Sequence, residues 1–128
     1  MVKEVSKSES AGYLKKSEEF LESARDSFNK ERFNAAGFDA TQSIINANDA
    51  LTIHFLGKRA SKDHREAIQF HLDVVRIISD DAGRKILADA LDIRNLVGYL
   101  GESIRKSESE KIIRSAAKFI DWVKKFVK

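Results

Sequence analysis

The sequence lacks several features that direct other folds and activities. Its 128 residues include no cysteine, which excludes disulfides, thiolate metal sites and cysteine catalysis. They include no proline and only 6 glycines, a composition that favours long uninterrupted helices over strands and turns. No apolar run is long enough to cross a membrane, and the segment Met1–Ser6 has no apolar signal region. We therefore expect a soluble cytoplasmic protein with no membrane association.

Charge is abundant in the chain but nearly balanced. Charged residues make up 34% of the sequence, with 23 Lys and Arg against 20 Asp and Glu. The net charge of +3 is too small to indicate nucleic-acid binding by itself. The length fits a single domain, residues 1–128, that can bury a core without cross-links.

The spacing of apolar residues predicts an all-α fold. We expect an up-and-down antiparallel helical bundle of four long helices plus one further helix, five in all. The first helix is expected at Ser10–Asn29. The second is expected at Phe33–Leu56, and Gly57 is a suitable C-terminal stop for it.

Capping and turn signals divide the rest of the chain into three more helices. They are expected at about 61–79, at about 82–103, and from 107 toward the C-terminus. Ser61 is a suitable N-cap for the third helix. Ser107 and Glu110 have the spacing of a capping box and predict the start of the fifth. Residues 57–60 are expected to form a loop and residues 79–81 a turn.

The expected second helix carries two lines of unusual composition. One line consists of small residues, which let a neighbouring backbone approach closely: Ala36, Ala40, Ser43, Ala47 and Ala50. The other line is polar: Asp39, Gln42, Asn46 and Asp49. The polar line has two interpretations, a face turned to solvent or one side of a binding site.

The histidines do not have the spacing of a metal site. His64 and His71 are seven residues apart on one expected helix, so the helical rise separates them by roughly 10 Å. Histidine ligands on a helix favour a spacing of three or four residues. We expect His54 near a helix end and His71 at the boundary of the core. The sequence predicts no metal and no cofactor.

Arg94 and Asn95 interrupt an otherwise apolar stretch of the expected fourth helix. Charged residues are seldom buried without a partner, so this pair indicates either a cleft or another subunit. Asn95 and Tyr99 are four residues apart and share one side of the helix. A guanidinium can bind phosphate in a fixed fork geometry. The alternative is an ion pair of Arg94 with Asp39 or Asp49 of the second helix.

The expected fifth helix is rich in basic residues on its outer side. They are Lys111, Arg114, Lys118, Lys124, Lys125 and Lys128. Such a helix can contact RNA phosphates. Here the basic residues alternate with an ordinary apolar stripe and have no aromatic neighbours on the same side, so a solvated surface is the favoured interpretation.

Five segments, taken in order, resemble those of a known family. They are Tyr13–Ser17 with Leu21 and Ala24, then Phe33–Ala36 with Ala40, Gln42 and Ala50–Leu51, then His64, then Arg94–Asn95, and finally Ala116–Val123. Their order and spacing resemble the HEPN domain, the nucleotide-binding domain of higher eukaryotes and prokaryotes. The resemblance covers nearly the whole chain.

The resemblance implies a fold and a partner, but this sequence departs from the family's ribonuclease motif. It implies an up-and-down bundle, usually a homodimer, with the motif at Arg94 lining a cleft between subunits. Many members are ribonucleases or toxins encoded beside a small nucleotidyltransferase antitoxin. The ribonuclease motif places a histidine four to six residues after the arginine, but these positions hold Gly98, Tyr99 and Leu100. Proton transfer near neutral pH thereby loses its best-suited group, and the motif resembles that of non-catalytic members.

Three functions follow as hypotheses. The favoured one is a non-catalytic, dimeric HEPN-like module that binds nucleotide or RNA, or a nucleotidyltransferase partner, in a toxin–antitoxin type of system. Its candidate site comprises Arg94, Asn95 and Tyr99 with the polar line of the second helix. The second is a divergent metal-independent ribonuclease that uses Arg94 and Tyr99. The third is a structural adaptor bundle without a ligand.

Overall fold

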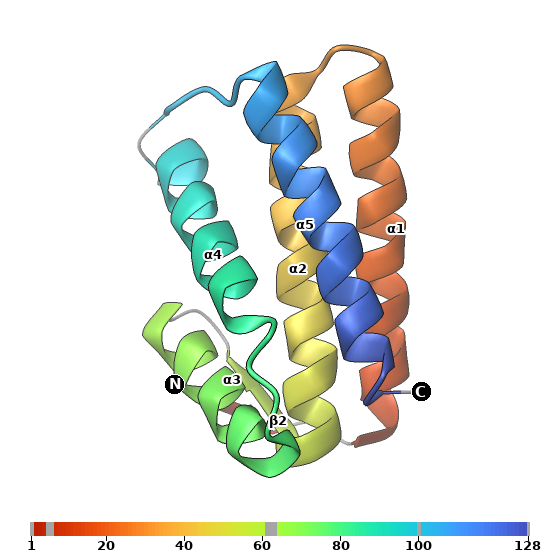
Figure 1. The fold of residues 1–128 in the computed structure, drawn as a ribbon, viewed down its shortest axis with the longest axis vertical. Coiled ribbons are helices and arrows are strands. Elements are labelled where there is room, and N and C mark those ends of the chain that lie inside the picture. The colour runs from red at the N-terminus through yellow and green to blue at the C-terminus, as the bar shows by residue number, and fades with distance from the viewer. Residues whose placement is uncertain (1, 5–6, 61–63, 100, 128) are drawn as a thin grey trace.

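The computed structural model describes residues 2–4, 7–60, 64–99 and 101–127. These residues form the all-α bundle that the sequence predicts (Figure 1). Its helices are α1 (Ser10–Asn29), α2 (Phe33–Leu56), α3 (His64–Ile78), α4 (Arg84–Tyr99) and α5 (Lys106–Lys124). In Figure 1, α1, α2, α4 and α5 run along the long axis in alternating directions, while α3 lies at one end of the bundle.

The first two helices begin and end where the sequence predicts. Gly57 ends α2 with a φ of 70°, in the left-handed region that glycine adopts without strain. The small line of α2 is buried throughout: Ala36, Ala40, Ser43, Ala47 and Ala50. The hydroxyl of Ser43 donates a hydrogen bond to the carbonyl of Ser17 on α1 at 2.7 Å. Small side chains thus allow α1 and α2 to approach closely.

Residues 58–60 form a strand, so the prediction of a loop at 57–60 is wrong there. Strand β2 (Lys58–Ala60) pairs antiparallel with β1 (Val2–Glu4), and Val2 lies opposite Ala60. The two strands are far apart in sequence, so no local pattern could reveal their pairing. A short 3-10 helix, η1 (Lys7–Glu9), then leads into α1.

The third helix is described from His64 onward, and the fourth helix is shorter than predicted. The described part of α3 is His64–Ile78, and its predicted N-cap Ser61 lies outside the described residues. The helix predicted at 82–103 is shorter at both ends. At its start, a carboxylate oxygen of Asp80 accepts the backbone N–H of Ala82 at 3.0 Å and holds the chain in a turn.

The last connection also differs from the prediction. Gly101, with a φ of 70°, follows α4 and directs the chain away from a helical path. α5 begins before the predicted capping box because Glu108 accepts the backbone N–H of Arg105 at 3.0 Å. Ser107 and Glu110 therefore lie within α5 and not at its boundary.

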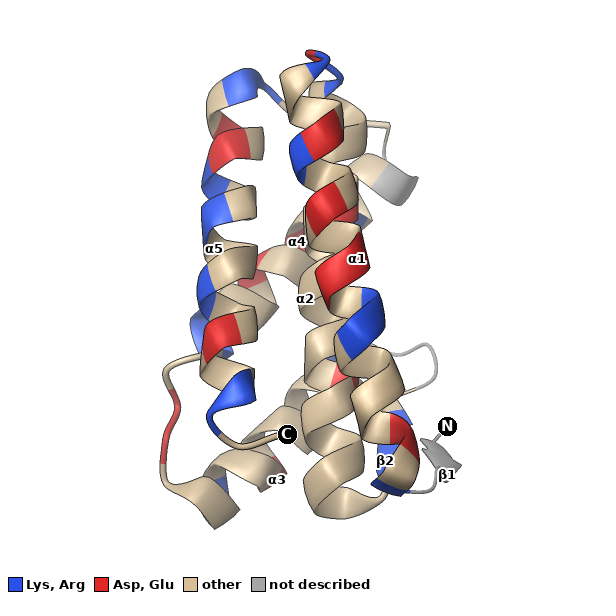
Figure 2. Ribbon diagram, turned by 90° about the vertical axis from the view of Figure 1, so that its right-hand side faces the viewer, with Lys and Arg blue, Asp and Glu red and all other residues tan. Residues whose placement is uncertain are grey.

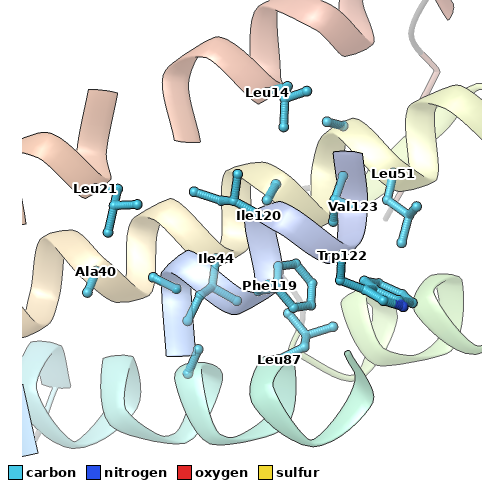
Figure 3. Packing of buried hydrophobic residues seen from close by; sticks show 14 of the residues in the cluster. Leu14, Leu21, Ala40, Ile44, Leu51, Leu87, Phe119, Ile120, Trp122 and Val123 are labelled. Atoms are coloured by element: carbon cyan, nitrogen blue, oxygen red, sulfur yellow. The ribbon is translucent and has the colours of Figure 1, made fainter. Parts of the chain in front are cut away.

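The core forms where α5 packs against α2 and α4 (Figure 3). Phe119 and Trp122 of α5 lie beside His71 of α3, with ring centres 6.2 Å and 5.6 Å from the imidazole. The prediction that His71 lies at the core boundary is wrong, because its side chain is fully buried. Its Nδ1 lies 2.8 Å from the side-chain oxygen of Asn48, which supplies a polar partner inside the core.

The outer side of α5 is a solvated basic surface (Figure 2). Lys111, Arg114, Lys118, Lys124 and Lys125 are all exposed. Some have acidic partners nearby: Lys124 lies 2.5 Å from Glu18 of α1, and Arg114 lies 3.4 Å from Glu110. None of the helices in the described residues is both long enough and apolar enough to cross a membrane.

Candidate functional site

A pocket of about 410 Å³ opens beside α2, where four other elements converge on it. α1 contributes Tyr13 and Lys16, α2 contributes Gln42, Ile45, Asn46, Asn48 and Asp49, β2 contributes Arg59 and Ala60, α3 contributes His64 and Ala67, and α4 contributes Leu87, Leu91, Arg94 and Asn95. The volume falls in the range of small-molecule sites. Three lining residues from three elements, Lys16, Arg59 and Arg94, carry full positive charges.

The fold brings most of the predicted site residues to this pocket. Gln42, Asn46, Asp49, Arg94 and Asn95 all line it. Asp39 lies apart from them, and its carboxylate accepts a hydrogen bond from the hydroxyl of Ser23 at 2.8 Å. Tyr99 is the last residue of α4, and its side chain lies outside the described part of the structure.

Asp49 has a different partner from the one that the sequence suggested. Within the described residues Arg94 forms no ion pair with Asp39 or Asp49. A guanidinium nitrogen of Arg59 instead lies 4.0 Å from the carboxylate of Asp49. The same guanidinium lies 5.1 Å from the centre of the Tyr13 ring, within the range of a cation–π contact. The positive charge that faces Asp49 therefore comes from Arg59 of β2.

Burial governs the charge of Asp49. It raises the pKa of this carboxyl to about 7, although the positive charges of Arg59, Arg94 and Lys16 act in the opposite direction. The carboxyl is therefore about half protonated near neutral pH, where arginine and lysine keep their charges. The net potential of the pocket is positive, so it suits an anionic group.

The chain also matches a known family. Residues 11–126, nearly the whole length, match the HEPN domain. The chain belongs to the HEPN family. No curated protein matches it. Family membership suggests a function related to nucleotides or RNA.

This HEPN domain places a histidine at the pocket from outside the family's motif. His64, the first residue of α3, lines the pocket, and its Nε2 lies 3.7 Å from a carboxylate oxygen of Asp92 on α4. His64 is one of the residues that resemble the family, but its position in the sequence did not indicate that it would line the same pocket as Arg94.

Sequence reasoning missed Lys16, Tyr13 and Arg59 as members of the site. Lys16 and Tyr13 are one turn apart on α1, and the Lys16 ammonium lies 4.8 Å from the centre of the Tyr13 ring. Arg59 belongs to β2, which the sequence did not reveal. These residues lie far from Arg94 in the sequence, and the packing of α1 and β2 against α2 is what joins them.

Two buried polar atoms of the lining residues lack partners. The side-chain oxygen of Gln42 and the Nε of Arg59 have no hydrogen bond within the described residues. Buried polar groups are seldom left unsatisfied, because each costs free energy. An acceptor and a donor thus remain unpaired beside the pocket. No group of three or more metal-ligating side chains is assembled within the described residues.

Proposed function

We propose that this HEPN domain is a non-catalytic binding module that holds a nucleotide, free or within RNA, in the pocket beside α2. The observation that carries the proposal is that Arg94 has no partner within the described residues. Its side chain lines the pocket and is only partly exposed, yet it has no ion pair or hydrogen bond within the described residues. A guanidinium in this setting can bind a phosphate through two parallel hydrogen bonds.

The remaining lining residues fit the other parts of a nucleotide. Lys16 adds a second cation from α1, while Gln42, Asn46 and Asn95 supply amide groups that can donate to and accept from a base or a ribose. Apolar contact is available from Leu87 and Leu91 of α4. This combination of a few polar groups with apolar walls is typical of ligand pockets.

A binding experiment with matched arginine variants tests the proposal. Isothermal titration with nucleoside monophosphates and a short single-stranded RNA should detect binding to the wild-type protein. Arg94→Ala should weaken it by about tenfold or more, because a charge-assisted contact to phosphate is lost. Arg114→Ala is the control, since Arg114 lies on the exposed side of α5 and pairs with Glu110. If none of these ligands binds, the hypothesis of a structural adaptor without a ligand is favoured.

A second candidate function is metal-independent RNA cleavage. The observation in its favour is that Asp49, with a pKa of about 7, can exchange a proton near neutral pH within the same pocket as His64. Cleavage of RNA in the presence of a chelator, lost in Arg94→Ala, would support it. Intact RNA after prolonged incubation would leave binding as the function.

We further propose that the domain is a homodimer and has a nucleotidyltransferase partner in a toxin–antitoxin type of system. HEPN domains often dimerise, and α4 carries an exposed apolar side chain, Leu96, two residues beyond Arg94. The nucleotidyltransferase partner is what the resemblance to toxin members of the family implies. Co-expression with the product of a neighbouring nucleotidyltransferase gene, followed by co-purification, tests that association.

A further inference from the structure

Asp49 and Arg59 form a pair whose hydrogen-bonding capacity is largely left unused by the packing of the protein. Their closest charged atoms are 4.0 Å apart, which is too far for a hydrogen bond. Both side chains are largely buried, with exposed fractions of 10% for Asp49 and 20% for Arg59. No hydrogen bond to the carboxylate of Asp49 is present within the described residues. The Nε of Arg59 donates none either, although its Nη1 donates to the backbone carbonyl of Ala60 at 3.4 Å.

The pair presents two acceptors next to a group of donors. A carboxylate can accept two parallel N–H bonds, and a guanidinium donates through a planar fork. The Watson–Crick edge of guanine has the complementary order, with the N2 and N1 donors followed by the O6 acceptor. Adenine presents only one donor on that edge, beside an acceptor that a carboxylate would repel. The chemistry of the pair therefore distinguishes the two purines.

We propose that the pocket is selective for a guanine nucleotide. The carboxylate of Asp49 accepts N1–H and N2–H of the base, and Arg59 donates to O6. Arg94 and Lys16 remain for the phosphate, and the buried oxygen of Gln42 is a further acceptor for a base or ribose donor. This inference rests on the proposed function, since it names the base that the nucleotide pocket prefers.

The charged groups around Asp49 predict how the preference depends on pH. Arg59 of β2, Arg94 of α4, Lys16 of α1 and His64 of α3 line the same pocket, and Asp49 is the one carboxylate among the described lining residues. Guanine binds the ionised carboxylate, so binding must release the proton that Asp49 carries below its pKa of about 7. The preference for GMP over AMP should therefore rise by about tenfold between pH 6 and pH 8. Titration of the phosphate affects both ligands alike and cancels in the ratio.

A ligand series tests the inference at constant pH. By isothermal titration at pH 8, GMP should bind at least about tenfold more tightly than AMP. IMP should lie between them, because it lacks the N2 amine and keeps the N1–H and O6. Arg94→Ala should weaken all of these ligands by a similar factor, since they share the phosphate.

The variant Asp49→Asn tests the assignment of Asp49 to the base most directly. Asparagine presents one acceptor and one donor in place of two acceptors, which matches the N1–H and O2 of xanthine. The variant should lose its preference for GMP, gain relative affinity for XMP, and lose the pH dependence of the GMP-to-AMP ratio. Its unfolding transition, measured alongside, verifies that it is folded.

The outcomes separate this inference from the proposed function. If GMP and AMP bind the wild-type protein equally and both depend on Arg94, the guanine inference is wrong and the nucleotide pocket stands. If Asp49→Asn retains the full preference for GMP, the assignment of Asp49 to the base edge is wrong. If no nucleotide binds at millimolar concentration, both the inference and the proposed function fail.

Discussion

The burial of Asp49 has a cost in stability. Its carboxyl lies largely buried beside Arg59, and burial raises its pKa to about 7 from an ordinary value of 3.8. Because the folded state disfavours the ionised form, the favourable contribution of this group is fully present below pH 3.8 and is lost as pH rises toward 7. At pH 8 the folded protein therefore carries a buried charge at a cost.

Asp49→Asn should remove that cost. We expect the variant to unfold at a higher urea concentration than the wild type at pH 8, with a gain on the order of 2–4 kcal/mol, and to differ little at pH 4. Chemical unfolding at both pH values measures the difference. A variant less stable than the wild type at pH 8 would show that the pair with Arg59 outweighs the burial of the charge.

His71 titrates in the opposite direction. Burial lowers its pKa to about 4 from 6.5, with a smaller effect from the charge of Arg84. Its contribution to stability is present above pH 6.5 and is lost as pH falls toward 4, because the fold disfavours the imidazolium. In the Asp49→Asn background, which removes the opposing titration, the free energy of unfolding should fall by about 2–3 kcal/mol between pH 7 and pH 4.

A second substitution at His71 serves as the control for that pH dependence. The double variant Asp49→Asn with His71→Gln should lose most of the fall between pH 7 and pH 4, whatever its absolute stability. If the slope persists, another group is responsible for the loss of stability in acid.

At the residue scale, the sequence singled out the polar residues of two long helices that line the pocket. Gln42, Asn46 and Asp49 follow one line of α2, and Arg94 and Asn95 stand out in an apolar stretch. Asp39 continues the same line but lies three residues nearer the start of α2 than Gln42. There it accepts a hydrogen bond from Ser23 and does not line the pocket. A helical line extends beyond any site that it borders, so periodicity alone could not show where the pocket ends.

At the scale of elements, the turn before α4 packs tightly onto α5. A Cβ added to Gly83 would lie 2.7 Å from a ring carbon of Trp122 and 2.8 Å from one of Phe119. Gly83→Ala should therefore destabilise the protein by about 1–3 kcal/mol, because buried rings must shift to admit the methyl group. Urea unfolding measures the change.

Gly12→Ala is the matched control for Gly83→Ala. Gly12 lies in α1, and a Cβ there would meet nothing within 4 Å. Alanine is the better helix former, so we expect no loss and a gain of up to about 1 kcal/mol. Equal losses at both glycines would contradict the packing explanation.

The elements that the sequence predicted well are those with local causes. α1 and α2 follow apolar periodicity, and Gly57 marks the end of α2 by its backbone conformation. The elements that it missed depend on distant or competing partners. β2 exists because it pairs with β1, and α5 begins early because Glu108, and not Ser107 with Glu110, caps the chain.

At the scale of the whole molecule, substitutions at two exposed apolar side chains test the proposed dimer. Among the described residues, the large exposed hydrophobic side chains are Leu96 of α4, at 45%, and Ile77 of α3, at 56%. If the dimer forms through α4, Leu96→Lys should shift it to monomer, since a lysine would have to lose water at the interface. Ile77→Lys should leave the dimer intact. Sedimentation velocity over a range of concentrations measures both.

Two outcomes would contradict the proposed dimer or its interface. A wild-type protein that remains monomeric at high concentration would rule out the homodimer. A dimer that Ile77→Lys dissociates and Leu96→Lys does not would place the interface on α3 instead of α4.

The pocket that α1, α2, β2, α3 and α4 build together is the basis of the proposed function. Backbone amide NMR spectra of the isotopically labelled protein, recorded while GMP is added, test it most directly. We predict that the shifts cluster at the residues around the pocket, including Lys16, Gln42, Asp49 and Arg94, and that the outer side of α5 around Arg114 stays unchanged. Shifts confined to α5, or no shifts at millimolar GMP, would contradict the account.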